Sequence, residues 1–513
     1  MTSQRLNDDC IYYVIKFLQY NHSNPFNYLL VNRFWCKVTV PLLYENPFSN
    51  LKDKSKILIV KTFLLCLNEE ERTYLTNQDS ICKVRKFFQN NPLRPIFEYP
   101  KYIKHLPKIL IYNAVDQWYR QQKINTCIPL KIAFYHMFLR QSNYIRNLEI
   151  FSDIFDGNIF DLHFINTFIF NISNLTNLQL YYHNNNREIF SEFLQVFAKN
   201  CKNLSQLSFE QFGPYDHLNE ISLIIKEQSR LKEFDYHIFT IDKPTSDIIF
   251  TSLEYQKDSL VSLKLYNITF QESILQSIIK LHHLKSLEID IPYDMTLELC
   301  GIFEFALFKL QILSIRNKFC KEIIISQIIK FLGITLQMLK VKYVNMEIME
   351  KIVQYCLELK TLDFEFSNKN LTILPCLKIL KIKNLNLHLF TTLDNEELFF
   401  LELAKNLSET TTNISFITLK VIDKHNLLIF LNNCHKYIIS LNLKCKCNLG
   451  HFKVILNYIK KNNDNNLKYL RIYDLDKIQN SKELILLHQI KKKGVNLVEF
   501  VDNYKENDYS YSD

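Results

Sequence analysis

Glycine and proline are scarce in this sequence. Its 513 residues include only 6 glycines and 12 prolines, which argues against glycine-rich phosphate loops and long flexible linkers. The longest apolar runs, such as residues 57–67, are interrupted by charge and fall short of the roughly 18 residues that a membrane-spanning helix needs. There is no His-Glu-x-x-His motif, and no Ser, His and Asp group into a nucleophile, base and orienting acid. We therefore expect a protein that is not an enzyme, holds no cofactor and does not span a membrane.

Charge and cysteine content narrow the class of protein further. The chain has 62 basic and 53 acidic residues, a net charge of +9, which is too modest for this length to predict nucleic-acid binding. Its 13 cysteines are odd in number and scattered, as in a reducing compartment. The first ten residues are polar and carry no secretory apolar region. We expect a location in the cytoplasm, the nucleus or both.

One cluster of metal-ligating residue types needs separate consideration. Cys434, His435, Cys445, Cys447 and His451 lie close in the sequence. A zinc site usually needs two separated ligand pairs, whereas Cys445 and Cys447 follow a strand on one alternating face. We expect buried structural thiols here and no metal site.

A short leucine frame organises most of the chain. In Leu260-Val-Ser-Leu263-Lys-Leu265, the last two leucines share one face of a strand because side chains alternate across it. The frame recurs as Leu175/Leu178/Leu180, Leu204/Leu207/Phe209, Leu231/Phe234/Tyr236, Leu284/Leu287/Ile289, Leu310/Leu313/Ile315, Leu336/Leu339/Val341, Leu359/Leu362/Phe364, Leu377/Leu380/Ile382, Phe416/Leu419/Val421, Ile438/Leu441/Leu443 and Leu467/Leu470/Ile472. Degenerate copies stand at Ile145/Leu148/Ile150 and at Leu497/Phe500.

The spacing of these frames predicts a repeat protein. The mean period is about 27 residues, within the range of leucine-rich repeats. Two intervals are odd, 18 residues (362 to 380) and 39 (380 to 419), and they predict a truncated repeat followed by an insertion over 385–413. Between frames the apolar spacing becomes helical, as at Ile274/Ile278/Ile279/Leu281, Ile323/Ile324/Ile328/Phe331 and Met349/Ile352/Val353/Cys356. Each unit is therefore strand, turn, helix and turn, and stacked units bury a common core.

This part of the chain resembles the leucine-rich repeat family, in its longer, helix-containing class. The resemblance implies an α/β solenoid shaped as a curved horseshoe, with parallel strands on the concave side and helices outside. The alternative is a generic α/β domain whose strands happen to be rich in leucine. The family often has Asn or Cys three residues after the third apolar position, where this chain has His183, Phe212, Ile268, Lys318, Val344 and Lys446. In this chain, other groups must therefore form the hydrogen bonds that the backbone of the turns requires.

The first 48 residues follow another pattern. A helix entry at residues 6–10 leads into an apolar stripe, and a second helix is expected from Phe26 to Pro41. The unit resembles an F-box, with Asn7 where that family has Pro. The first half of the pattern falls on Leu6, Asp9, Cys10, Val14, Ile15 and Leu18, and the second on Leu30, Val31, Asn32, Arg33 and Trp35, followed by Pro-Leu-Leu-Tyr at 41–44. The alternative is a helical cap over the first repeat.

The F-box resemblance implies a specific partner. F-box proteins dock on a Skp-type adaptor, which joins them to a cullin-RING ubiquitin ligase. An exposed apolar surface on a small domain is the physical requirement. The adaptor-binding residues expected on this basis are Leu6, Cys10, Ile15, Leu18, Leu29, Leu30, Val31 and Trp35.

A protein substrate is expected on the concave side of the repeats. The strand residues that flank the second and third apolar positions are mainly acidic and aromatic in the early repeats and mainly basic from the seventh repeat onward. The basic set is Arg316, Lys340, Lys342, Lys381, Lys383, Lys420, Lys444 and Arg471. We expect these residues to bind an acidic or phosphorylated segment of the substrate. The alternative is that exposed lysines keep the strands soluble and their edges unpaired.

The expected organisation has four parts. They are an F-box-like helical domain over 1–48, a helical bridge over 49–143, a solenoid of about 14 repeats over 144–502, and a polar tail over 503–513. Within the bridge, helices are expected near 57–67, 80–88, 109–120 and 130–140. The function expected is a substrate-recognition subunit of a cullin-RING ubiquitin ligase. The alternative is a leucine-rich protein-interaction scaffold with no link to a ligase.

Overall fold

The protein is described from a computed structural model. It describes residues 8–20, 26–49, 53–77, 82–91, 94–122, 128–156, 159–183, 187–212, 217–239, 247–316, 321–366, 368–390, 395–434, 438–461 and 466–499. The chain divides into two compact units, Met1–Tyr266 and Asn267–Asp513. Leu6, Phe500 and the polar tail lie outside the described residues, as does the side chain of Leu18.

The first unit begins with helices. They are α1 (Asp8–Tyr20), α2 (Phe26–Leu29), α3 (Arg33–Leu43), α4 (Asp53–Cys66), α5 (Glu69–Thr76), α6 (Cys82–Asn90), η1 (Tyr99–Tyr102), α7 (Lys108–Gln122) and α8 (Ile128–Gln141). The four helices expected between residues 57 and 140 are confirmed as α4, α6, α7 and α8, and α5 was not predicted. The two-residue strand β1 (His105–Leu106) lies in the same stretch and pairs in parallel with the next strand.

The single helix expected over residues 26–41 is wrong, because the chain breaks at residues 30–32. Asn32 caps a new helix there, and its side-chain oxygen accepts from the backbone N–H groups of Phe34 at 3.0 Å and Trp35 at 2.9 Å. An asparagine that satisfies these otherwise unpaired groups stabilises a helix start. The new helix, α3, runs through Pro41 to Leu43.

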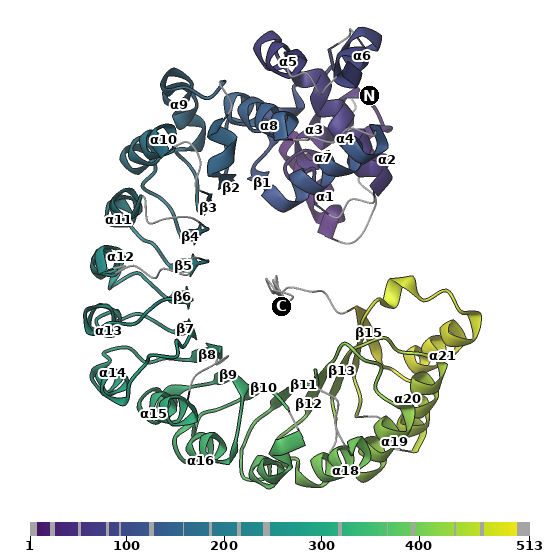
Figure 1. Ribbon diagram of the computed structural model, residues 1–513. Helices are drawn as coiled ribbons and strands as arrows, with labels where there is room; N and C mark the ends of the chain where they lie inside the picture. Colours follow the sequence, from purple (N-terminus) through teal and green to yellow (C-terminus); the bar gives the residue numbers. More distant parts are fainter. Residues whose placement is uncertain are drawn as a thin grey trace. The chain divides into compact units, whose positions relative to one another are not determined.

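The rest of the first unit alternates strands with helices. The strands are β2 (Asn147–Phe151), β3 (Asn177–Tyr182), β4 (Gln206–Gln211), β5 (Glu233–Ile238) and β6 (Ser262–Tyr266). Between them lie η2 (Ser152–Asp156), α9 (Leu162–Phe168), η3 (Ile169–Ile172), α10 (Arg187–Asn200), α11 (Leu218–Glu227), α12 (Asp247–Leu253) and η4 (Glu254–Gln256). Neighbouring strands pair in parallel, and the helices cover one face of the sheet (Figure 1).

The second unit continues the alternation. Its strands are β7 (Ser286–Asp290), β8 (Ile312–Arg316), β9 (Met338–Tyr343), β10 (Thr361–Glu365), β11 (Asn384–His388), β12 (Asn413–Ile417), β13 (Ser440–Lys444), β14 (Tyr469–Ile472) and β15 (Asn496–Glu499). Its helices are α13 (Glu272–Ile279), α14 (Leu297–Gly301), η5 (Ile302–Phe305), α15 (Glu322–Leu332), η6 (Gly333–Thr335), α16 (Met346–Tyr355), η7 (Asn368–Ile373), α17 (Leu374–Leu377), α18 (Glu396–Asn406), α19 (Lys424–Asn433), α20 (Leu449–Lys461), η8 (Leu475–Lys477) and α21 (Ser481–Lys492). Both units are α/β repeat solenoids of the leucine-rich type, as the frame predicts. We call the sheet face turned away from the helices the open face.

The register of the strands corrects the frame at three places. Leu385 pairs with Leu362, Ile414 pairs with Leu385, and Leu497 pairs with Leu470. The central position in these repeats is therefore 385, 414 or 497, in place of the expected 380, 419 or 500. The intervals from 362 become 23, 29 and 27 residues. The truncated repeat and the long insertion predicted from sequence are wrong.

Burial explains the correct register. Ile414 and Phe416 are fully buried, whereas Leu419 is 89% exposed and Val421 is 50% exposed. Alternation places Ile414 and Phe416 on the face that packs against the helices. The expected frame would have placed Leu419 and Val421 in the core. In the structure both side chains lie after the strand and are exposed.

Two buried glutamines satisfy turn backbone in the first unit. The Gln228 side chain accepts from the Leu204 N–H at 2.9 Å and donates to the Cys201 carbonyl at 2.9 Å. One repeat later, Gln256 accepts from the Leu231 N–H at 3.2 Å and donates to the Gln228 carbonyl at 2.9 Å. Buried backbone groups need such partners. These glutamines perform this task where each helix leads into the next strand.

Candidate functional site

The three N-terminal helices enclose a small apolar core. Ile11 and Ile15 of α1 pack against Leu42 of α3, and Trp35 and Tyr28 pack against this cluster. The rings of Tyr28 and Trp35 lie 6.1 Å apart, inclined by 50°. Of the expected adaptor-binding residues, Ile15 is fully buried, and Trp35 is half-buried against the core. Both side chains therefore hold the helices together.

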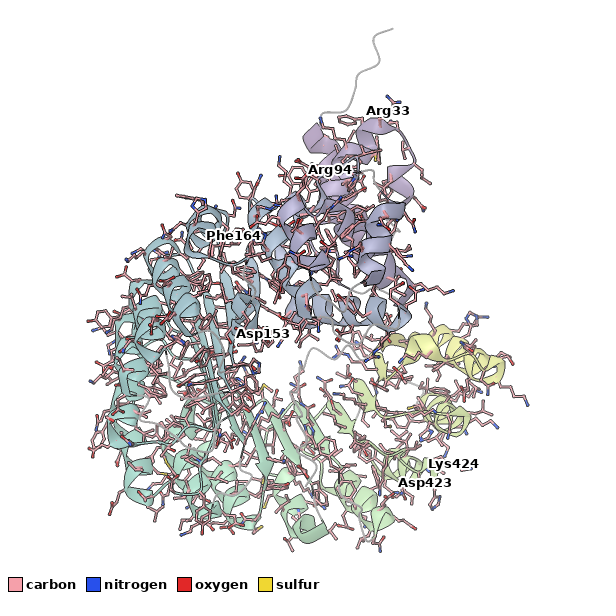
Figure 2. The ribbon with its side chains drawn as sticks, turned by 45° about the horizontal axis from the view of Figure 1, so that its top comes forward. Arg33, Arg94, Asp153, Phe164, Asp423 and Lys424 are labelled. Carbon is pink, nitrogen blue, oxygen red and sulfur yellow. The ribbon has the colours of Figure 1, made fainter. Side chains whose placement is uncertain are left out.

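A second set of apolar side chains on these helices faces solvent. Leu30 is 86% exposed and Val31 is 56% exposed, in the break between α2 and α3. Tyr13 and Phe17 of α1 are exposed by 68% and 66%, and Phe26 of α2 by 61%. We call these five residues the N-terminal apolar face. Figure 2 shows the side chains of this region, with Arg33 labelled at the start of α3.

The sequence identified only part of this face. Leu30 and Val31 were expected from the motif, and Cys10 is exposed and Leu29 half-buried. Tyr13 and Phe17 were missed because they lie outside the expected apolar stripe of α1, of which Val14 is itself 45% exposed. Phe26 was expected only as the start of the second helix. An amphipathic plot would have shown α1 to be apolar on more than one side, which is unusual for a helix of a small isolated domain.

On the open face of the first unit, aromatic rings stack near the ends of the strands. Phe151 and Tyr181 lie 4.4 Å apart and within 6° of parallel. Phe212 and Phe239 repeat the arrangement at 4.3 Å and 1°. The ammonium group of Lys108 lies over the ring of Phe151. These contacts confirm the aromatic character expected for the early repeats.

Burial lowers the pKa of Lys108 to about 8. The carboxylates of Asp153, Glu210 and Glu149 oppose this shift, because they favour the charged amine. Burial in turn raises the pKa of Asp153. The Lys108 amine is therefore partly neutral near physiological pH.

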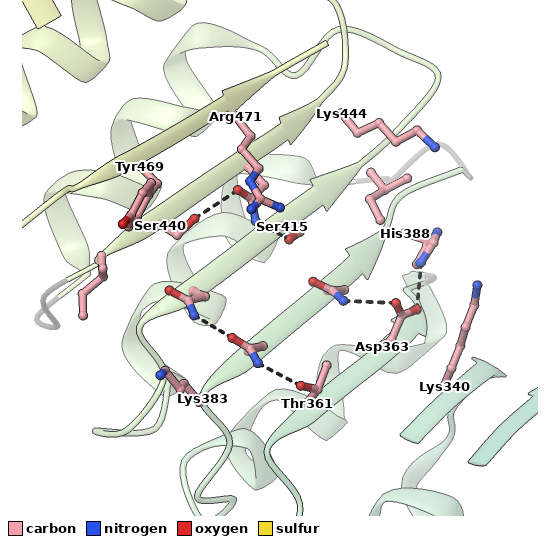
Figure 3. Close-up of a pocket in the computed structure, with 16 residues that line it drawn as sticks. Lys340, Thr361, Asp363, Lys383, His388, Ser415, Ser440, Lys444, Tyr469 and Arg471 are labelled. Atoms are coloured by element: carbon pink, nitrogen blue, oxygen red, sulfur yellow. Dashed lines mark hydrogen bonds and ion pairs between the residues drawn. The ribbon is translucent and has the colours of Figure 1, made fainter. Parts of the chain in front are cut away.

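On the open face of the second unit, a depression of about 610 Å³ extends over strands β9–β14 (Figure 3). Four of the eight basic residues expected to bind substrate line it, namely Lys340, Lys383, Lys444 and Arg471. Thr361, Asp363, Asn384, Asn386, His388, Asn413, Ser415, Ile417, Ile439, Ser440, Asn442 and Tyr469 complete the lining. The structure therefore brings half of the expected set to one place.

Amide and hydroxyl groups form a hydrogen-bonded network in this depression. Asn384 donates to the Thr361 hydroxyl at 2.8 Å and accepts from Asn413 at 2.6 Å. Asn442 donates to the hydroxyl of Ser415 at 2.8 Å. Each bond joins equivalent positions of adjacent strands (Figure 3). Asn384, Asn413 and Ser415 were missed because the expected frame was displaced in β11 and β12. The frame of β10 and β13 was correct, but Thr361 and Asn442 are neutral and so fell outside the basic set.

The carboxylate that lines the depression is held by its neighbours. Oδ1 of Asp363 lies 2.8 Å from Nε2 of His388, and Oδ2 accepts from the Asn386 amide at 3.1 Å. Asp363 and His388 are 4% and 8% exposed. Both carboxylate oxygens are therefore occupied within the protein.

The other four basic residues lie elsewhere. Arg316 in β8 pairs with Glu288 at 3.2 Å, and Lys342 in β9 lies over the ring of Tyr343. Lys381 precedes β11 and Lys420 follows β12, and both are exposed outside the strands. The expected position of Lys381 and Lys420 on the open face of a strand is thus wrong, because the frame was displaced there.

The expectation of buried thiols holds for one of the three cysteines, since Cys434 and Cys447 are half-buried. Cys445 is buried, and His451 is 1% exposed, with Nε2 2.6 Å from the Ile422 carbonyl. His435 lies outside the described residues. Within the described ranges, no three His, Cys, Asp or Glu residues are placed to hold a metal ion. None of the described helices is long and apolar enough to cross a bilayer.

No protein-family model and no curated protein matches this chain. Among solved structures, it is similar to a chain in the crystal structure of the Rad7 and Elc1 complex in yeast, with 14% identity and a TM-score of 0.38. The match covers 77% of this chain and 88% of that chain. So distant a likeness says nothing about what this chain binds.

Proposed function

We propose that this protein is the substrate-recognition subunit of a cullin-RING ubiquitin ligase. In this proposal, the F-box-like domain over 1–48 docks on a Skp-type adaptor. The helices over 49–143 form a bridge, and the repeats over 144–502 hold a protein substrate. The observation that carries the proposal is the N-terminal apolar face, on helices that also match the F-box pattern.

The N-terminal apolar face has the properties of a docking surface. Its side chains are distinct from those of the Ile11/Ile15/Leu42 core, so it is not needed to hold the three helices together. Large exposed apolar residues on a small helical unit are typical of an interaction site. A partner that covers Leu30 removes a side chain from water that is 86% exposed in this chain, worth roughly 2 kcal/mol.

The mechanism of such a subunit is positioning. A chain that binds the ligase at one end and the substrate along its repeats raises the effective concentration of substrate lysines at the ubiquitin carrier. The chain itself needs no catalytic residue for this. The repeats suit the task because they offer side chains from many strands on one open face.

The test is binding to a purified Skp-type adaptor, measured by calorimetry. Introducing Leu30→Asp and Val31→Asp together should abolish binding, because two charges would have to be buried in the apolar contact. The matched control is Ile96→Asp, since Ile96 is 95% exposed and lies outside the face. We expect the control to bind like the unchanged protein.

The outcomes separate the two functions. If the unchanged protein fails to bind any Skp-type adaptor, or if the double variant binds as tightly as the control, the proposal is wrong. The scaffold without a ligase link would then be the better account. Trp35 is a poor choice for this test because it packs against the core, and its loss would disturb the helices themselves.

A further inference from the structure

The depression on the open face of the second unit combines two kinds of anion-binding group. Lys340, Lys383, Lys444 and Arg471 surround it, and neutral amides and hydroxyls fill its floor (Figure 3). The strand positions at its centre carry short side chains, such as Ser415 in β12, whereas the cations around it are long. This difference in length produces a hollow with positive charge at its margin.

We propose that this depression binds a phosphorylated serine or threonine in an extended segment of the substrate protein. The inference rests on the proposed function, because it names the class of substrate that the repeats recognise. Six strands spaced by about 4.8 Å span roughly 24 Å, the length of about seven extended residues. A segment of this length bearing one phosphate and further acidic residues reaches all four cations.

Two features favour a phosphate over a lone carboxylate. A phosphate carries close to two negative charges and three acceptor oxygens, so it takes hydrogen bonds from amide donors as well as from Lys and Arg. The amide groups of Asn384, Asn413 and Asn442 each donate one N–H to a neighbouring side chain of the floor. An amide has two such donors, so each of the three has a second N–H that a phosphate oxygen can accept from. A single carboxylate group would use only a small part of this donor set.

The one carboxylate that lines the depression does not oppose an anion strongly. Asp363 is bound through both oxygens, by His388 at 2.8 Å and Asn386 at 3.1 Å. Burial raises the pKa of the nearby Glu365. The four cations of the lining outnumber Asp363 and Glu365, so the net charge that an incoming ligand meets is positive even with both carboxylates ionised.

The lining also favours a protein segment over a nucleic acid. Single-stranded nucleic acids bind grooves in which successive bases stack on aromatic rings. Among the lining residues, only Tyr469 and the hydrogen-bonded His388 carry rings. The depression therefore lacks a row of stacking platforms, and its polar floor suits the backbone and side chains of an extended peptide.

The test uses the full chain and pools of short synthetic peptides of random sequence around one fixed residue. That residue is phosphoserine, serine or glutamate, and binding is followed by fluorescence anisotropy. We expect the phosphoserine pool to bind at least roughly tenfold more tightly than the serine pool, with glutamate between them. Lys383→Gln combined with Arg471→Gln should lose most of this preference.

A matched variant separates the effect of the depression from the effect of net charge. Lys381→Gln combined with Lys420→Gln removes the same charge from exposed sites outside the depression, and we expect it to retain the preference. Equal losses in both variants would show that net charge alone acts, and the proposal would be wrong. So would equal binding of the serine and phosphoserine pools, or tighter binding of a single-stranded oligonucleotide.

The proposed function is tested separately. The Leu30→Asp and Val31→Asp variant should lose the adaptor but bind the phosphoserine pool normally. If the adaptor binds and the peptides do not, the substrate class alone is wrong. If the peptides bind and the adaptor does not, the depression binds phosphopeptides in a protein of another function.

Discussion

Glu71 and His136 lie side by side in the interior of the first unit, with Oε1 of the glutamate 2.8 Å from Nδ1 of the histidine. Glu71 is 0% exposed and His136 is 1% exposed. Arg140 donates to both oxygens of the carboxylate, each at 3.0 Å. The carboxylate also accepts from the Asn68 N–H at 2.7 Å, closing a capping box at the start of α5. One buried side chain thus both caps α5 and joins it to α8.

We therefore expect Glu71→Ala to destabilise this helical region strongly. Removing one partner of a buried charged network leaves the others unpaired and costs about 3–5 kcal/mol. Hydrogen exchange at the amides of α5 and α8 should report the loss. Glu70→Ala, at an exposed site in the same turn, should change stability by less than about 0.5 kcal/mol. Similar protection in the two variants would show that the network contributes little.

The corrected register of β12 makes a second prediction. Phe416→Ala should cost about 3–5 kcal/mol, because the ring is fully buried among helices. Leu419→Ala should cost less than about 0.5 kcal/mol, because this side chain is 89% exposed. Chemical unfolding followed by circular dichroism compares them. A larger loss of stability for Leu419→Ala than for Phe416→Ala would support the strand position expected from sequence.

The lowered pKa of Lys108 predicts that the stability of the protein depends on pH. Burial lowers its pKa from 10.5 to about 8 in the folded protein, so the unfolded chain holds more protons at this site between these values. Stability then rises with pH from about 8 toward 10.5, and below pH 8 the site contributes a constant cost. Replacing the lysine with methionine should remove this rise from the unfolding free energy measured between pH 7 and 9.5.

The matched variant for Lys108 is Lys101→Met, at an exposed lysine that pairs with Glu98 at 3.8 Å. It should keep the pH profile of the unchanged protein. If Lys108→Met and the unchanged protein show parallel profiles, the Lys108 amine titrates alike in the folded and unfolded chains.

The thiols should divide into two classes of reactivity. Burial raises the pKa values of Cys201 and Cys356 to about 12, and the thiolate is the reactive form. At pH 8 we expect iodoacetamide to modify the exposed Cys10 first and to spare both buried thiols until the protein unfolds. Mass spectrometry of tryptic peptides measures this order. Early modification of Cys201 would show that its repeat opens readily.

The repeat fold could be predicted from sequence because its signal is periodic. Leucines at fixed spacing mark positions such as Leu263 and Leu339, and the structure buries both completely. The frame failed in β11 and β12, where several apolar residues compete. Leu380 and Leu419 fit the pattern as well as Leu385 and Ile414 do, and only the pairing with neighbouring strands selects the register.

The sites were harder to predict for related reasons. The expected frame lay five residues from the true one in β11 and β12. It therefore assigned Lys381 and Lys420 to strands that they do not belong to, and it missed Asn386 and His388. At the N-terminus, the sequence identified apolar residues without dividing core from surface. Leu30 and Trp35 are both large and apolar, and three-dimensional packing alone decides that one is exposed and the other is half-buried.

The hydrogen-bonded floor of the depression draws between one and three side chains from each of the strands β10–β13. Because these side chains point away from the packed interior, exchanging one of them leaves the apolar core of the adjoining repeats intact and disturbs only hydrogen bonds between strands. Descendants of this gene can therefore acquire a new ligand preference by steps that spare the core. The parts of the chain that evolve fastest should be the open-face positions, while the paired leucines behind them stay fixed.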